Sequence, residues 1–181
     1  PGWTNARPSP LAETLRAGAL FPSPAARAAA CACLSSAVAG QSPAAVARLV
    51  RDDVLEHVFE VLREASRERS ELSCAEAPSR PGGPRAPAEA RLFAHTTAAA
   101  TADAARRGAL TCLLDVLRAA APDPEATHAC STRMACGVDV LAAALTRSVR
   151  ERDAETAAAA ARLARAVAEL GAPGSVAGSA A

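Results

Sequence analysis

The sequence predicts an all-α fold built as a stack of helical repeats, an α-solenoid of about three incomplete units. Apolar residues recur at three- and four-residue spacing over most of the chain, and β-branched runs are absent, which is typical of amphipathic helices. Alanine, the strongest helix former, dominates the composition. Similar segments also begin at residues 54, 109 and 138. Internal repetition of this kind indicates stacked supersecondary units.

The composition fits one helical domain and argues against several functional classes. The chain has 181 residues, of which 50% are hydrophobic, so a sizeable core is expected. Its 20 basic and 19 acidic residues nearly cancel, whereas a general nucleic-acid-binding domain is strongly basic. No run approaches the roughly 18 apolar residues of a membrane span, and no signal peptide is predicted. With only six cysteines, the chain is expected to be reduced and intracellular, in the cytoplasm or, slightly favoured, the nucleus.

Pro- and Gly-rich stretches divide the chain into segments. The expected segments are a partial helix and linker (1–22), a first repeat unit with the start of a second (23–77), a disordered linker (78–87), degenerate units (88–170) and a disordered tail (171–181).

The first unit carries the clearest helix signals. Ser23 and Ser42 are each followed by proline, and a serine N-cap with proline in the first turn is a common helix start. Gly40 is a typical C-terminal glycine for the first helix. A short helix is expected through Val50, followed by a longer amphipathic helix from Val54. The predicted order is therefore long helix, short helix, long helix.

The later copies are less regular. Residues 54–63 align without gaps on residues 109–118, and residues 138–145 are a fainter copy. The first and last copies start 84 residues apart, which is two periods of about 42. The interval before residue 138 is too short for three helices, so one helix is expected to be missing there. Residues 154–170 are expected to form the first helix of a further, truncated unit.

These helices resemble the armadillo repeat, whose third helix usually begins with glycine, an apolar residue and a short spacer before paired leucines. Residues 108–117 follow this pattern, residues 137–141 follow it more loosely, and Asp53 replaces the glycine in the first copy. Residues 30–36 resemble the small-residue centre of the family's first helix. The motif does not separate armadillo from HEAT repeats. A looser resemblance, over residues 23–65, is to the armadillo-like meiosis inhibitor proteins of vertebrates.

The resemblance implies a right-handed superhelix whose third helices line a concave groove that binds extended segments of other proteins. It therefore implies a non-catalytic scaffold or adaptor that binds a partner peptide or helix. The candidate contact residues lie on the exposed side of the predicted third helices: Glu56, Glu60, Arg63, Thr111, Asp115 and Arg118. Nuclear-import adaptors of this family carry asparagines on that face, whereas the first unit here carries carboxylates, which favour a basic or neutral peptide.

An alternative hypothesis is a nuclear factor of meiotic chromosome complexes, acting in double-strand-break formation or recombination. Such a factor would associate with DNA-bound partners or with nucleic acid through arginine clusters near helix ends. The clusters are Arg48 with Arg51, Arg106 with Arg107, and Arg147 with Arg150 and Arg152. Solvated faces that complement helix C-terminal dipoles are the favoured interpretation of these arginines.

No residue set predicts catalysis. The chain has no G-x-S-x-G nucleophile elbow, and His57 fits a helix-surface histidine better than a general base. The glycine-rich tail follows no strand and precedes no lysine, which argues against a phosphate loop. We therefore expect no enzyme activity, no cofactor and no small-molecule substrate. The expected partners are other proteins, with nucleic acid less favoured and no membrane.

The cysteines do not predict a metal site. Cys31 and Cys33 lie about 200° apart on a helix, so they cannot share a metal ion. The closest His/Cys cluster has the spacing H-x-C-x5-C, which is not that of the common zinc sites. It comprises His128, Cys130 and Cys136, and a fourth ligand would have to come from Cys112 or Cys74. Buried structural thiols are the favoured interpretation.

Overall fold

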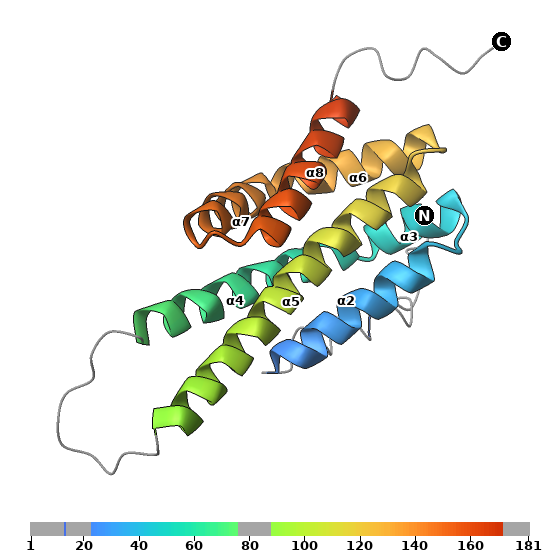
Figure 1. Ribbon diagram of the computed structural model, residues 1–181. Helices are drawn as coiled ribbons and strands as arrows, with labels where there is room; N and C mark the ends of the chain where they lie inside the picture. Colours follow the sequence, from blue (N-terminus) through green and yellow to red (C-terminus); the bar gives the residue numbers. More distant parts are fainter. Residues whose placement is uncertain (1–12, 14–22, 76–87, 172–181) are drawn as a thin grey trace.

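The computed structural model describes residue 13 and residues 23–75 and 88–171, and the last two ranges form seven helices (Figure 1). The helices are α2 (Pro24–Val38), α3 (Pro43–Arg51), α4 (Val54–Ala75), α5 (Ala88–Ala120), α6 (Pro124–Cys136), α7 (Val138–Arg150) and α8 (Ala154–Gly171). The all-α prediction is confirmed for this part of the chain, in which no strand occurs. The predicted N-terminal linker, the linker at 78–87 and the tail after Gly171 lie outside the described residues.

Side-chain caps explain where three of the helices begin. The Ser23 hydroxyl accepts a hydrogen bond from the backbone N–H of Ala26 (3.5 Å), and Ser42 accepts one from Ala45 (3.4 Å). The Asp123 carboxylate accepts two backbone hydrogen bonds, at 2.8 and 3.2 Å, at the start of α6. Each cap is followed by proline in the first turn. The helix starts predicted at Ser23 and Ser42 are therefore confirmed.

The helices pack in a pattern that repeats every three elements. In the first set of contacts, α2 packs on α5, and α5 in turn packs on α8, while α3 packs on α6 and α4 on α7. In the second set, α4 packs on α5 and α7 packs on α8. Helices α2–α4 and α5–α7 are therefore two triplets with corresponding contacts, and α8 packs on α5 as α5 packs on α2. Figure 1 shows α2 and α5 running side by side in the same direction.

The sequence prediction for the middle of the chain is wrong. Residues 109–118 were expected to form a third helix of their own, but they continue the 33-residue helix α5. Gly108, the expected start of a third helix, lies inside α5. An internal glycine costs a helix only about 1 kcal/mol, and the surrounding segment is rich in alanine and lacks proline. No helix is missing before residue 138, because residues 109–118 belong to α5, and α5 and α6 are the two helices that precede α7.

One core joins all seven helices. A single cluster of buried apolar side chains has members in each of these helices. Its largest fully buried members include Leu34 of α2, Leu55 and Leu62 of α4, Leu110 and Leu113 of α5, Met134 of α6 and Leu163 of α8. Each such side chain stabilises the fold by about 1.5–3 kcal/mol. Helix α5 lies at the centre, because it packs against α2, α4 and α8.

Candidate interaction surfaces

Three of the predicted contact residues, Glu56, Glu60 and Arg63, are exposed on α4. Glu60 forms an ion pair with Arg63 one turn further along the same helix. Glu56 forms an ion pair with Arg133 of α6, whose guanidinium also lies 2.9 Å from the Asp53 carboxylate. The carboxylates of this face are therefore matched by arginines, and the face is less acidic than the sequence of α4 suggests.

The other three predicted contact residues lie on α5 and have different neighbours. Thr111 and Arg118 are exposed, and Asp115 is half-buried. The Asp115 carboxylate accepts a hydrogen bond from the Ser35 hydroxyl of α2 at 2.7 Å and lies 3.8 Å from Arg118. Because α5 belongs to the layer with α2 and α8, the six predicted residues occupy two different layers rather than two equivalent third helices.

Three surface hollows each lie between two helices that pack on one another. One hollow of about 420 Å³ lies between α4 and α7, and another of about 430 Å³ lies between α5 and α8. A smaller hollow of about 280 Å³ lies between α3 and α6, beside Arg51, His128 and Arg133. Each pair comprises equivalent helices of successive triplets, so the hollows follow from the way the triplets stack.

The α4–α7 groove has an apolar floor between walls that carry polar groups. Val140 and Ala143 contribute apolar surface from α7. Arg147 of α7 donates a hydrogen bond to the backbone carbonyl of Ser66 and so ties the two helices together. On the α4 wall, the Arg67 guanidinium is held by Glu64 at 2.7 Å and Glu71 at 3.0 Å. The further lining residues are Arg63, Ser70 and Asp139.

The sequence prediction found only part of this groove. Among the residues it proposed, only Arg63 lines the hollow. The α7 side was missed because the sequence alignment placed residues 109–118, rather than α7, beside α4. The useful signal was the 84-residue separation between Val54 and Val138, which are the first residues of the equivalent helices α4 and α7.

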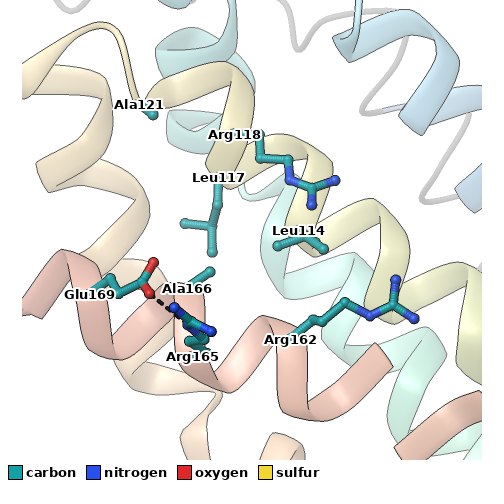
Figure 2. A pocket seen from close by; sticks show the side chains of 8 residues that line it. All are labelled: Leu114, Leu117, Arg118, Ala121, Arg162, Arg165, Ala166 and Glu169. Atoms are coloured by element: carbon teal, nitrogen blue, oxygen red, sulfur yellow. Dashed lines mark hydrogen bonds and ion pairs between the residues drawn. The ribbon is translucent and has the colours of Figure 1, made fainter. Parts of the chain in front are cut away.

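A second groove lies between α5 and α8 (Figure 2). Its floor is apolar, and three arginines and one glutamate stand around it. The floor residues are Leu114, Leu117, Ala121 and Ala166, and the charged residues are Arg118, Arg162, Arg165 and Glu169. None of the α8 residues was singled out by sequence, because an exposed arginine in an alanine-rich helix carries no local sign of a groove.

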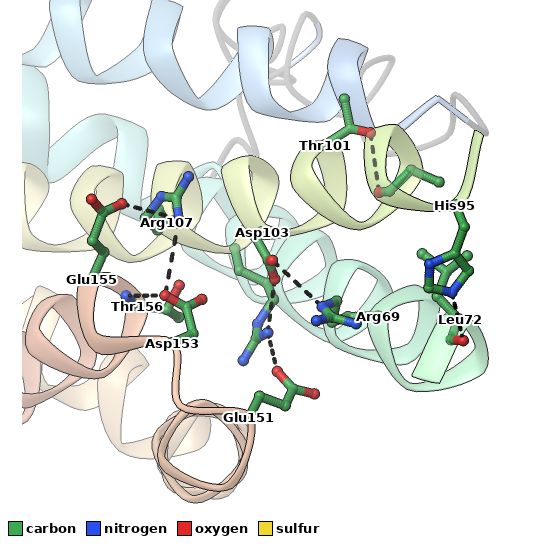
Figure 3. A network of polar contacts seen from close by, with 12 residues as sticks. Arg69, Leu72, His95, Thr101, Asp103, Arg107, Glu151, Asp153, Glu155 and Thr156 are labelled. Carbon is green, nitrogen blue, oxygen red and sulfur yellow. Dashed lines mark hydrogen bonds and ion pairs between the residues drawn. The ribbon is translucent and has the colours of Figure 1, made fainter. Parts of the chain in front are cut away.

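Arg106 is a buried structural residue, not part of a basic surface. Its side chain is 0% exposed and pairs with Asp103 at 3.1 Å and Glu151 at 2.6 Å. Asp103 also lies 3.4 Å from Arg69, so this network links α4, α5 and the segment that follows α7 (Figure 3). Burial raises the pKa of Asp103 despite its two arginine neighbours. The interpretation of the arginine clusters as solvated faces is therefore wrong for Arg106.

The neighbouring Arg107 is partly exposed and pairs with Glu155 of α8 at 3.2 Å. It also lies 4.0 Å from Asp153, which immediately precedes α8. Burial works to raise the pKa of Asp153, but the hydrogen bond from the backbone N–H of Thr156 and the charges of two nearby arginines outweigh it, so the pKa lies below its ordinary value. These contacts fasten the start of α8 to the middle of α5.

Three of the cysteines are buried thiols of low reactivity. Burial raises the pKa of Cys31 to about 12 and that of Cys130 to about 11. Burial also raises the pKa of Cys112 well above its ordinary value. Since the thiolate is the nucleophile and the metal ligand, these side chains suit a core. Cys33 is exposed, on the opposite side of α2 from Cys31.

Neither a metal centre nor a membrane segment emerges from the described part of the chain. Within it, no group of three or more His, Cys, Asp or Glu side chains is arranged to hold a metal ion. None of the helices in the same residues is long and apolar enough to cross a bilayer.

Comparison with known proteins finds no matching family model, no matching curated protein and no matching solved structure. The function must therefore be inferred from the packing and the surfaces of this chain.

Proposed function

We propose that the chain is a non-catalytic scaffold of armadillo type, which binds a segment of another protein along the groove between α4 and α7. The observation that carries the proposal is the packing pattern that repeats every three helices. In stacked repeats of this kind, equivalent helices of successive units line an extended binding surface. Helices α4 and α7 are the last members of the two triplets, the position of the third helix in an armadillo unit.

The side chains of the α4–α7 groove suit a peptide better than a small substrate. The walls offer guanidinium, hydroxyl and carboxylate groups, of which Arg67 and Arg147 are already held in place by neighbours. Oriented polar groups beside an apolar floor can bind the backbone and the side chains of an extended segment. The open hollow exposes this surface along both helices.

Site-specific photocrosslinking tests this assignment. A benzophenone amino acid at Ala143, which lines the groove, is expected to capture a defined partner protein in an extract of the native tissue. Ala142 provides the matched control, since it is the preceding exposed alanine of α7 and does not line the groove. Equal capture from both positions would contradict the proposal.

Charge changes with the captured partner test which α4 residues take part. Arg67→Glu is expected to lower the partner's affinity by about tenfold or more, because it reverses the charge of a groove wall. Glu56→Lys with Glu60→Lys tests the residues proposed from sequence. If that double variant leaves the affinity unchanged while Arg67→Glu lowers it, the contact surface is the groove and not the Glu56–Glu60 side of α4.

Association with nucleic acid, as in a meiotic chromosome complex, has less structural support. Arg106 is buried, while Arg51 and Arg107 are paired with glutamates. Retention on DNA that weakens steeply with salt is the observation that would favour this alternative.

A further inference from the structure

The groove between α5 and α8 combines an apolar floor with basic rims on both sides (Figure 2). Leu114 and Leu117 of α5 and Ala166 of α8 supply the floor. Arg118 stands on the α5 side and Arg162 on the α8 side, and Figure 2 shows the two leucines of the floor between these two helices. A ligand in this groove would therefore meet apolar surface below it and a positive charge from each helix.

The rim arginines are available to a ligand to different degrees. The Arg162 Nε donates to the backbone carbonyl of Ala158 at 3.2 Å, and among the described residues no carboxylate lies within 4.0 Å of its guanidinium. Arg118 is 68% exposed, with Asp115 at 3.8 Å as its ion-pair partner. Both guanidinium groups therefore keep hydrogen-bond donors directed to solvent.

Arg165 is the third arginine, and it is 82% exposed. It pairs with Glu169 of its own helix at 2.8 Å, and Glu169 is the only carboxylate among the residues described as lining the groove. An exposed pair of this kind contributes little stability, so Arg165 can exchange Glu169 for a carboxylate of a ligand. The lining thus carries an excess of positive charge.

We propose that this groove binds an acidic amphipathic helix of another protein. A row of apolar side chains on that helix would cover Leu114, Leu117 and Ala166, and its flanking carboxylates would pair with Arg118 and Arg162. Arginine suits this role, because its fork of N–H donors binds a carboxylate in bidentate geometry. An apolar helix face laid into a groove is a common mode of peptide recognition. The charge of the rim selects acidic partners over basic ones.

Nucleic acid is a different polyanionic ligand that these arginines could bind. Its phosphates would pair with the guanidinium groups without contacting the apolar floor. Phosphate contacts depend on charge and salt, whereas an amphipathic helix also depends on burying its apolar row. The site is separate from the α4–α7 groove, because the two grooves share no lining residue. This proposal rests on the chain being a protein-binding scaffold, but variants of one groove can be tested without changing the other groove.

Fluorescence anisotropy with a synthetic peptide tests the proposal. The probe is a labelled peptide of roughly 14 residues, about four turns when helical, with leucines along one face, glutamates beside them and alanines elsewhere. The control probe has the same composition, with the leucines scattered around the helix. The first peptide is expected to bind the full chain at least about tenfold more tightly than the scattered peptide.

Two variants examine the rim and the floor separately. Arg118→Glu combined with Arg162→Glu is expected to weaken peptide binding about tenfold or more, and Ala166→Glu is expected to do the same by placing a carboxylate on the floor. The matched controls are Arg48→Glu with Arg150→Glu, and Ala164→Glu. These residues are exposed and do not line the groove, so their effects are expected to stay below about twofold.

Three results would overturn the proposal. One is equal weakening by the rim variant and its charge-matched control, which would show a non-specific charge effect. Another is equal binding of the two peptides, which would show that the apolar row is not recognised. The third is tight binding of duplex DNA that is lost in the rim variant but kept in Ala166→Glu, which would identify the ligand as nucleic acid.

Discussion

The aromatic ring of Phe59 in α4 lies against the backbone of Gly137, the residue that joins α6 to α7. A Cβ atom on Gly137 would overlap the ring. The φ angle of Gly137 is −103°, which other residues adopt readily, so the glycine is needed for space and not for backbone freedom. This contact lets the start of α7 approach α4, the helix with which α7 forms a groove.

Gly137→Ala is therefore expected to destabilise the protein by about 1–3 kcal/mol, because the new methyl group displaces a buried ring. Urea denaturation followed by circular dichroism measures the difference. Gly108→Ala is the matched control, since its Cβ would lie 3.6 Å from the Cβ of Cys31, an ordinary contact. This control is expected to be neutral or to stabilise by up to about 1 kcal/mol. Equal effects of the two substitutions would contradict the packing described for Phe59.

These two glycines also show how much of the fold the sequence predicts. Both precede an apolar run, and the sequence assigned both to the start of a third helix. A helix does begin directly after Gly137, whereas Gly108 lies inside α5. The two glycines also differ in their surroundings, since Phe59 fills the space beside Gly137 and Cys31 lies beside Gly108, and both neighbours are distant in the chain. Helix starts with a serine cap and proline were predictable because their cause is local.

The candidate sites were harder to predict for the same reason. The groove walls come from helices that only tertiary packing brings together, such as α5 and α8. Arg106 appears in the sequence as an ordinary polar residue in a helix, and its partner Glu151 lies 45 residues further along the chain. The composition indicated a helical fold with a core but not which arginines are buried.

Arg106→Ala is expected to destabilise the fold by about 3–5 kcal/mol, because Asp103 and Glu151 would lose the buried charge that they share. Arg107→Ala is the matched control on the adjacent position. Its side chain is 37% exposed, and the loss of its pairing with Glu155 is expected to cost less than about 1 kcal/mol. Thermal and urea unfolding of both variants provide the comparison, and similar losses would show that burial of Arg106 has no special role.

Ionisation of Asp153 makes the stability of the fold depend on pH. Its folded-state pKa is lowered, so the ionised form stabilises the fold at pH values above the ordinary carboxyl pKa of about 3.9. This contribution is lost as the pH falls below that value and through the lower folded-state pKa. Asn at this position can still accept the hydrogen bond from the backbone N–H of Thr156, which measures 3.0 Å.

Asp153→Asn is therefore expected to be less stable than the parent by about 0.5–1 kcal/mol at neutral pH, because it removes a charge at a helix N-terminus. The difference should shrink as the pH falls below about 4. Unfolding free energies measured across this range check the sign, and a difference that grows in acid would contradict the lowered pKa.

Thiol labelling is expected to separate the cysteines by burial. Cys33 and Cys136 are exposed and should react with iodoacetamide in the native protein at about pH 8. Cys31, Cys112 and Cys130 are buried, with raised pKa values, and should react only after denaturant is added. Mass spectrometry of the digested protein identifies the modified sites. Rapid native labelling of Cys112 would show that the contact between α2 and α5 opens readily.

The central position of α5 also affects how the chain folds during its synthesis. Helices α2 and α4 each pack extensively on α5 and touch one another only slightly. Their apolar faces therefore stay uncovered until α5 has been made. At about 5–20 residues per second, the ribosome needs roughly 2–9 seconds to add residues 76–120. During those seconds the nascent first triplet presents an unfinished core to chaperones and to neighbouring chains.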